Sequence, residues 1–451
     1  MSKTFHTNGN KIVDDKGHIV KLKGVSRTGL EYNYVDLNAM IPETIDMDIR
    51  MMKEWGFNSI RFPIRDVFWL NDILYRNKIK YWVDRTLNNS MIPILDLHTQ
   101  QNHIGLDNFM LKMGYVKEMW VDIAQTYKGD HRIFFEIFNE PHNIDVDVWW
   151  NGDSTYYGYN EILKQIRAHA DNICIIGGLD YAYQWAFLKK NTTLLKQIQA
   201  FDNIVLSTHP YGYRGHPTSD GTGSIQIPTI VMNVDKLNYT GDCHLGITVP
   251  VVSSKEYGWT ESFGFVVEEN LFPMIATEWG LDRPDNCIQG GWYNTEMLDY
   301  LNFMNISYMA WAWVQDRLDY PSLLGENFVP TGRAVRETFG PACSGAYNQY
   351  YPGPGVLIKN DLQTFNLHHR NLKIDYSNTT DPEVNSIIFR NFMILFLILF
   401  SVFNIFFIFP YPKYHEKKPS NVSPSSPIHR SSSVNNLQSS IRIRSVHSFP
   451  S

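Results

Sequence analysis

Eight apolar runs recur along the first 340 residues, each followed by polar or aromatic residues and a helical stretch. Runs of this kind are typical of strands that are covered on both faces. Strands that alternate with helices predict a parallel sheet, and eight such units predict an α/β fold, a (β/α)8 TIM barrel with insertions, rather than an open doubly wound sheet. The predicted strands are 22–31, 56–64, 91–99, 133–140, 172–180, 203–212, 271–280 and 306–314.

The intervening segments show the spacing of amphipathic helices. Between residues 44 and 55, apolar side chains recur at helical spacing, namely Ile45, Ile49, Met52 and Trp55. A second helical pattern surrounds Ile162, Ile166 and Ala170. The N-terminal residues, MSKTFHTNGNKIVDDKG, predict a hairpin-like cap.

Two of the predicted strands end on a glutamate. Glu140 follows the apolar run 133–138 and precedes Pro141, which cannot donate to a strand ladder. Glu278 follows a second apolar run in the same way. Either residue alone is more often a capping or salt-bridging group. Together, at the barrel rim where catalytic groups lie, they suggest a carboxylate pair for cleavage of a glycosidic bond.

Further polar and aromatic side chains stand at the other strand ends and should converge on the same rim. They are Arg61, His98, Asn139, His209, Tyr211, and Trp311 or Trp313. Several have a structural alternative: the arginine could bridge to a barrel carboxylate, the histidines could be hydrogen-bonded in the core, and the tryptophans could pack. A sugar, however, needs a flat apolar surface, and the chain has 12 Trp and 25 Tyr.

The strand-end motifs resemble those of glycoside hydrolase family 5, nearest to its bacterial endoglucanase-like branch. In order they read GVSRTGLE, SIRFPI, ILDLH, FNEPH, STHPYG, ATEWG and AWAW, and the resemblance covers residues 5 to 340. It implies that Glu140 is the general acid/base and Glu278 the nucleophile. It also implies that Asn139 contacts the sugar 2-hydroxyl. The implied polar shell is Arg61, His98, His209 and Tyr211, and the implied floor is Trp311, with Trp313 as the alternative because the register of AWAW is open.

The chemistry of a retaining glycosidase requires the two glutamates to differ in protonation. One carboxylate must attack as an anion and the other must deliver a proton, although both have a reference pKa of about 4.3. We expect Arg61 and Tyr211 to hold Glu278 ionised. We expect desolvation and the charge of Glu278 to keep the proton on Glu140.

The predicted function is therefore a retaining β-glycosidase acting on a polysaccharide or oligosaccharide, with a β-1,4-glucan as the favoured substrate. A β-mannan, a β-1,3-glucan or a glycolipid remains open, as does a catalytically silent carbohydrate-binding receptor. No metal or cofactor is expected, because HExxH, CxxC and Gly-rich phosphate loops are missing from the sequence. The net charge of −6 does not suggest a nucleic-acid partner. A Cys243–Cys287 disulfide is open, but free buried thiols are favoured.

The last hundred residues change in character. Residues 341–386 predict a closing segment and stalk, 387–410 a transmembrane helix, and 411–451 a disordered Ser-rich basic tail. Within the helix, 391–409 are 19 residues without a charge, long enough to cross a bilayer core of about 30 Å.

Basic residues after the predicted span set its orientation. Lys413, Lys417 and Lys418 favour a cytoplasmic tail, and thus a barrel that is extracellular or lumenal. Five Asn-x-Ser/Thr sites are compatible with that placement: Asn88, Asn191, Asn238, Asn305 and Asn378. The N-terminus has no apolar signal segment, so either a signal peptide is missing from this sequence or the barrel is cytosolic. We favour the former.

Overall fold

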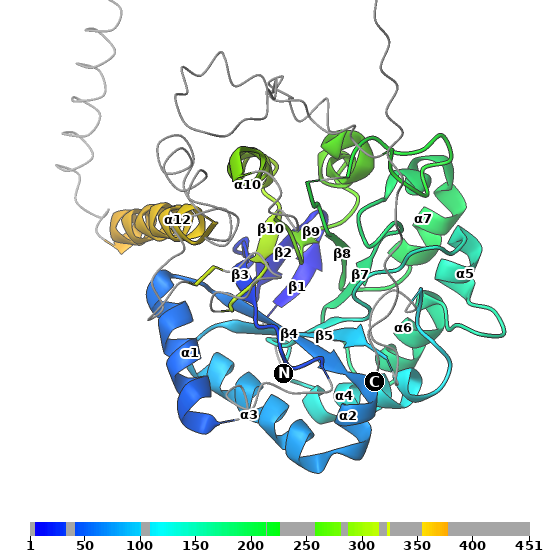
Figure 1. The fold of residues 1–451 in the computed structure, drawn as a ribbon, viewed down its shortest axis with the longest axis horizontal. Coiled ribbons are helices and arrows are strands. Elements are labelled where there is room, and N and C mark those ends of the chain that lie inside the picture. The colour runs from blue at the N-terminus through cyan, green and yellow to red at the C-terminus, as the bar shows by residue number, and fades with distance from the viewer. Residues whose placement is uncertain are drawn as a thin grey trace, which may run out of the picture. The chain divides into compact units, whose positions relative to one another are not determined.

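A computed structural model describes residues 5–32, 41–100, 109–212, 214–225, 258–280, 287–314, 323–324 and 354–377. Parallel strands form a closed barrel in the order β10-β3-β4-β5-β6-β7-β8-β9, with helices around it (Figure 1). The predicted eight-stranded parallel barrel is confirmed. The strands are β3 (Lys23–Ser26), β4 (Ser59–Arg65), β5 (Ile92–Thr99), β6 (Phe134–Glu136), β7 (Cys174–Gly177), β8 (Ile204–Thr208), β9 (Met274–Ala276) and β10 (Ser307–Ala310).

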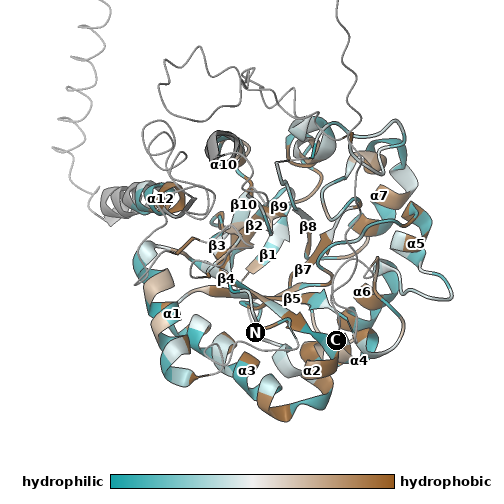
Figure 2. Cartoon of the chain, in the orientation of Figure 1, coloured by the Kyte–Doolittle hydropathy of each residue, from teal (hydrophilic) through white to brown (hydrophobic). Residues whose placement is uncertain are grey.

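Helices cover the outside of the barrel, and Figure 2 shows both hydrophobic and hydrophilic residues on them. The first, α1 (Pro42–Trp55), begins with a proline at its N-terminus and ends at Gly56, whose φ of 106° is left-handed. Its buried side includes the four predicted apolar residues. The second predicted pattern is α6 (Tyr159–Arg167), which ends before Ala170. The other helical segments are α2 (Asp66–Asn71), α3 (Ile73–Asn88), α4 (Tyr115–Tyr127), α5 (Val146–Asn151), η2 (Ala186–Lys190), α7 (Thr192–Gln199), η4 (Thr260–Gly264), α9 (Phe265–Glu268), α10 (Cys287–Phe303) and α12 (Pro354–Ser377).

The N-terminal hairpin closes one end of the barrel. Strands β1 (Phe5–Asn8) and β2 (Lys11–Asp14) pair antiparallel, as the cap prediction requires. Ile12 joins the apolar cluster inside the barrel, and Phe5 packs edge-on against Phe134 at the start of β6, with ring centroids 6.0 Å apart. The hairpin therefore plugs the end where the strands begin, so the polar residues that follow the strands lie at the opposite end.

Helix α12 lies inside the predicted closing segment and is tied to the barrel. The carboxylate of Asp361 accepts hydrogen bonds from Lys23 Nζ at 2.7 and 2.8 Å, from Tyr308 Oη at 2.6 Å and from Asn302 Nδ2 at 2.8 Å. Lys23 and Tyr308 belong to β3 and β10, the first and last strands of the closed barrel. Asp361 thus stabilises the seam at which the barrel closes.

The predicted membrane span at 391–409 and the basic tail lie outside the described residues. Among the residues that the structure describes, no helix combines the length and the apolar character that a bilayer crossing demands. Cys174 is a buried free thiol. Cys243, Cys343 and the side chain of Cys287 fall outside the described part, so the disulfide question stays a prediction.

Candidate active site

Arg61 lies at the centre of the polar cluster that follows the strands. It is fully buried on β4, and its guanidinium reaches Glu136 Oε2 at 2.6 Å, Glu278 Oε1 at 2.7 Å, Asp96 Oδ2 at 2.9 Å and Asn139 Oδ1 at 2.7 Å. Burial alone would lower the pKa of Arg61, but the three carboxylates outweigh burial and raise it well above its ordinary value. The arginine therefore bridges barrel carboxylates and contacts Glu278 as well.

Glu278 follows β9 and is held at both carboxylate oxygens. Its side chain is nearly buried, with Oε1 accepting from Arg61 and Oε2 accepting from Tyr211 Oη at 2.8 Å. His98 Nδ1 lies 3.8 Å from Oε1. These neighbours are hydrogen-bond donors or cationic groups, so both carboxylate oxygens of Glu278 are held in place.

His98, at the end of β5, is paired with Asp96. Its Nδ1 lies 2.8 Å from Asp96 Oδ2. Burial lowers the pKa of His98, but the hydrogen bond and charge of Asp96 raise it to about 9. Burial raises the pKa of Asp96 to about 6 against the opposing charge of Arg61. At neutral pH the pair is therefore an imidazolium and a carboxylate, and His98 Nδ1 is the donor.

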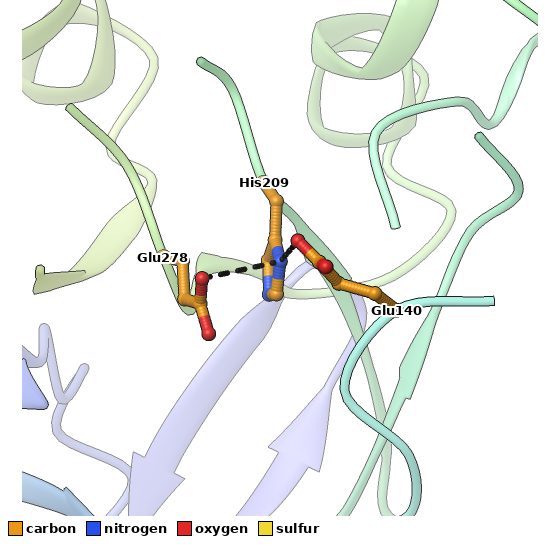
Figure 3. A group of neighbouring side chains, drawn as sticks. All are labelled: Glu140, His209 and Glu278. Atoms are coloured by element: carbon orange, nitrogen blue, oxygen red, sulfur yellow. Dashed lines mark hydrogen bonds and ion pairs between the residues drawn. The ribbon is translucent and has the colours of Figure 1, made fainter. Parts of the chain in front are cut away.

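Glu140, which follows β6, is paired with His209 after β8 (Figure 3). Glu140 Oε1 and His209 Nδ1 are 3.0 Å apart, and 28% of the Glu140 side chain is exposed while His209 is buried. Burial raises the pKa of Glu140, but the hydrogen bond and charge of His209 prevail and lower it. Burial also opposes the charge on His209, yet Glu278, Glu136 and Glu140 raise its pKa to about 9. The expectation that desolvation keeps the proton on Glu140 is therefore wrong: in the free site that proton rests on His209.

The two glutamates and His209 converge. One carboxylate oxygen from Glu140, one from Glu278 and one ring nitrogen of His209 all lie within 4.8 Å of one another. Atoms at this spacing could hold a metal ion, but each glutamate already has a donor, and the cationic Arg61 touches Glu278. The donor set fits a hydrogen-bonded acid–base group better than a cation site, and the expectation of no metal stays a prediction.

The two candidate tryptophans occupy different places. Trp311 comes directly after β10, and its ring stacks on His98 with centroids 5.6 Å apart and planes 5° apart. Trp313 is 1% exposed, donates to Asp48 Oδ1 at 3.1 Å and packs edge-on against Trp55. The alternative that Trp313 forms the sugar floor is not supported by its position in the helix-facing core, whereas Trp311 lies beside the other predicted site residues.

Three buried polar residues of the cluster were not predicted from the sequence. They are Asp96 and Glu136, which hold Arg61, and Thr277, which donates to Glu136 Oε1 at 2.6 Å and lies 3.0 Å from His209 Nε2. The available signal is a charged residue inside an apolar strand run, as Glu136 is in IFFEIF. A charge in a buried strand needs a partner inside the barrel, because every second side chain of a barrel strand points inward.

Comparison with known proteins gives a family. Residues 13–317 match the family model of cellulase, glycosyl hydrolase family 5. An endoglucanase from Paenibacillus polymyxa is 21% identical over 374 residues, which are 74% of this chain and 86% of that protein.

Solved structures share the barrel fold. The β-glucanase SdGluc5_26A from Saccharophagus degradans has a TM-score of 0.54 at 21% identity, covering 81% of this chain and 94% of that one. The catalytic domain of Thermobifida fusca endoglucanase Cel5A in complex with cellotetraose has a TM-score of 0.51 at 15% identity, covering 80% and 98%. The family model spans well over half of the sequence and confirms the resemblance of the strand-end motifs. The chain is a glycosidase and belongs to the cellulase family, glycosyl hydrolase family 5.

Proposed function

We propose that this chain hydrolyses a β-1,4-glucan by double displacement, with Glu278 as nucleophile and Glu140 as general acid/base. The observation that carries the proposal is the approach of the two carboxylates to within 4.8 Å. Retaining glycosidases place their carboxyl groups about 5–5.5 Å apart, whereas inverting ones leave about 6.5–9.5 Å for a water molecule. The spacing here supports direct attack on the sugar.

In the first step, a carboxylate oxygen of Glu278 forms a bond to the anomeric carbon. The bond from that carbon to the glycosidic oxygen breaks, and the leaving oxygen takes a proton from Glu140. In the second step, water gives a proton to Glu140 and its oxygen displaces Glu278 from the anomeric carbon. Arg61 and Tyr211 stabilise Glu278 as an anion before attack and as a leaving group afterwards.

The proton for the first step comes from the Glu140–His209 pair. Because the two groups titrate together, one proton is shared between His209 Nδ1 and Glu140 Oε1. A glycosidic oxygen that approaches Glu140 draws this proton onto the carboxyl group, since the leaving oxygen becomes more basic as its bond breaks. Glu140 can reach the substrate because part of its side chain is exposed.

The sugar that is cleaved fits against Trp311 and Asn139. The Trp311 ring is flat and apolar, stacks on His98 and keeps 6% of its surface exposed, and the sugar is proposed to lie against that exposed part. Asn139 Oδ1 is fixed by Arg61, which orients the amide NH2 to donate to a sugar hydroxyl. Because Trp311 follows β10 and because His98 and Arg61 lie on β5 and β4, the glycone lies on that side of Glu278 and the leaving group lies toward β7 and β8. The endoglucanase and β-glucanase relatives support a glucan as the polymer.

Release of reducing sugar from a panel of polysaccharides tests this proposal. The panel contains three polysaccharides, a soluble β-1,4-glucan, a β-1,3-glucan and a β-mannan, and activated aryl glycosides are assayed beside it. Each substrate is tested with wild type, Glu278→Ala and Glu140→Ala. We expect the β-1,4-glucan to be cleaved fastest and Glu278→Ala to be inactive on all three. We expect Glu140→Ala to keep activity only on aryl glycosides whose leaving groups need no proton. Faster cleavage of the mannan or the β-1,3-glucan would contradict the linkage, and binding without any release would favour the receptor alternative.

For the location of the enzyme, we propose that residues 391–409 anchor the chain in a membrane with the barrel extracellular or lumenal. The uncharged span and the lysines that follow it support this placement.

A further inference from the structure

A buried chain of hydrogen bonds continues from Glu140 and His209 into the barrel, and two of its members, Thr277 and Glu136, have no part in the proposed function. His209 Nδ1 lies 3.0 Å from Glu140 Oε1, and His209 Nε2 lies 3.0 Å from Thr277 Oγ1. Thr277 donates to Glu136 Oε1 at 2.6 Å, and Glu136 Oε2 accepts from Arg61 Nε at 2.6 Å. Glu136, Thr277 and His209 are at most 1% exposed, so these contacts are shielded from bulk solvent.

The direction of each hydrogen bond in this chain follows from Arg61. Its guanidinium only donates, and it holds Glu136 as a carboxylate, which only accepts. Thr277 has one hydroxyl proton and gives it to Glu136. The lone pairs of Thr277 Oγ1 must then accept from His209 Nε2, so Nε2 carries a hydrogen whether His209 is neutral or cationic.

We propose that Thr277 and Glu136 are positioning residues that fix the tautomer of His209, so that Nδ1 is the ring nitrogen that shares a proton with Glu140. This inference rests on the proposed acid/base role of Glu140. Because the hydrogen on Nε2 is fixed, loss of the shared proton leaves Nδ1 with an unprotonated lone pair. This lone pair then points at the negatively charged carboxylate of Glu140. That state is unfavourable, so the pair retains its proton to higher pH than it would with a freely chosen tautomer.

The surroundings of His209 agree with this arrangement. Three carboxylates face its ring: Glu136 at 3.9 Å and Glu140 at 3.0 Å, both supplied by the segment of β6, and Glu278 at 3.8 Å, which follows β9. Tyr211 lies on the same segment as His209 and donates to Glu278. His98 and His142 act by charge on Glu140. The nearest charges are all acidic, and they raise the pKa of His209 to about 9. The acidic neighbours stabilise the doubly protonated ring. After the shared proton is lost, the hydrogen bond to Thr277 determines that Nε2 is the nitrogen that keeps its hydrogen.

Two substitutions should reverse the tautomer, and one should preserve it. Thr277→Val removes the acceptor for Nε2–H at nearly constant volume. In Glu136→Gln, Arg61 Nε still needs an acceptor, so the amide oxygen takes the place of Oε2 and the NH2 group faces Thr277. Thr277 must then accept from the amide and donate to His209 Nε2, which moves the neutral ring's hydrogen to Nδ1. Thr277→Ser keeps the hydroxyl and serves as the matched control.

The direct test is ¹⁵N NMR of histidine-labelled protein across a pH series that extends above the His209 pKa of about 9. The ¹⁵N resonances of His209 are identified as those that disappear from the spectrum of His209→Asn. We expect the Nε2–H tautomer in wild type and Thr277→Ser at high pH, and the Nδ1–H tautomer in Thr277→Val and Glu136→Gln. A wild-type pattern in all three variants overturns the proposal, as does an Nδ1–H tautomer in wild type.

The pH–rate profile gives the second readout. In Thr277→Val and Glu136→Gln the alkaline limb of kcat/KM on a glucan should move down by about one pH unit or more, because Nδ1–H stabilises ionised Glu140. Rates on activated aryl glycosides near neutral pH should change little. An alkaline limb that stays in place overturns the positioning role. The NMR result does not depend on catalysis, so a protein inactive on glucans would contradict the proposed function while leaving the tautomer assignment standing.

Discussion

Arg61 joins the nucleophile to the barrel interior, and its role is both electrostatic and structural. Substituting Arg61 by alanine should leave Asp96, Glu136 and Glu278 buried without their shared cation. We expect the free energy of unfolding to fall by about 3–5 kcal/mol, the usual cost of breaking a buried ion pair. Turnover on a glucan should also fall by about 10²-fold or more, because Glu278 loses the cationic hydrogen-bond donor that positions its attacking carboxylate.

Urea denaturation and the turnover rate per folded molecule measure the two effects of Arg61→Ala. The control is Arg132→Ala, because Arg132 pairs at the surface with Asp130 at 2.6 Å and its loss should cost less than about 1 kcal/mol. A rate per folded molecule that stays at the wild-type value, with only poorer folding, would show that Arg61 serves the fold and not the nucleophile.

His98 should make stability depend on pH. Its folded-state pKa of about 9 lies above the ordinary value of 6.5, so the folded state binds a proton more tightly than the unfolded chain. The stabilisation is complete below pH 6.5 and is lost as the pH rises through about 9. The difference in unfolding free energy between wild type and His98→Gln should therefore shrink over that window, by about 1–3 kcal/mol. A constant or growing difference, measured by urea denaturation at each pH, would contradict the ion pair with Asp96.

The sequence predicted which side chains meet at the site but not how they share protons. A parallel barrel brings every strand end to one rim, so Arg61, His98, His209 and Glu278 could be placed there from motif order alone. The location of the proton could not be predicted, because it depends on the 3.0 Å contact between Glu140 and His209. The choice of Trp311 over Trp313 likewise depends on where β10 ends, which AWAW does not define.

At the scale of elements, the strands and the first helix were predictable because their apolar patterns are long and regular. The positions at which the elements end were less predictable. The apolar run 133–138 predicted a strand that ends just before Asn139, but β6 covers only Phe134–Glu136. Beyond β6, the chain turns to place Asn139 and Glu140 at the rim, and contacts with neighbouring strands decide where that turn begins. Helix α12 had no distinct pattern in a segment rich in Tyr, Pro, Gly and Asn.

Helix α12 should be necessary for a stable barrel. Asp361→Ala would leave Lys23, which is only 4% exposed, without its counter-ion at the seam between β3 and β10. We expect a loss of about 3–5 kcal/mol in unfolding free energy. Asn360→Ala, at an exposed position on the same helix, should change stability by less than about 1 kcal/mol. Equal thermal and urea stability of the two variants would contradict a structural role for α12.

At the scale of the whole chain, deletion of residues 387–451 should release an active, soluble barrel from membranes. No residue of the proposed site lies beyond Trp311, and the deletion retains α12. In a secretory host with a supplied signal peptide, protease added to intact cells should remove the barrel and spare the tail of the full chain. A protected barrel with an accessible tail would contradict the proposed orientation, and a full chain that stays in the soluble fraction would contradict the anchor.

The chemistry of the whole enzyme is tested most directly by the anomer that it releases first. Direct attack by Glu278 followed by attack of water inverts the anomeric carbon twice, so cleavage of a β-glucan should produce the β-anomer. Proton NMR during the first minutes of hydrolysis, before mutarotation, distinguishes the two anomers. Initial accumulation of the β-anomer is the predicted result. Initial accumulation of the α-anomer would contradict the assignment of Glu278 as nucleophile and Glu140 as acid/base.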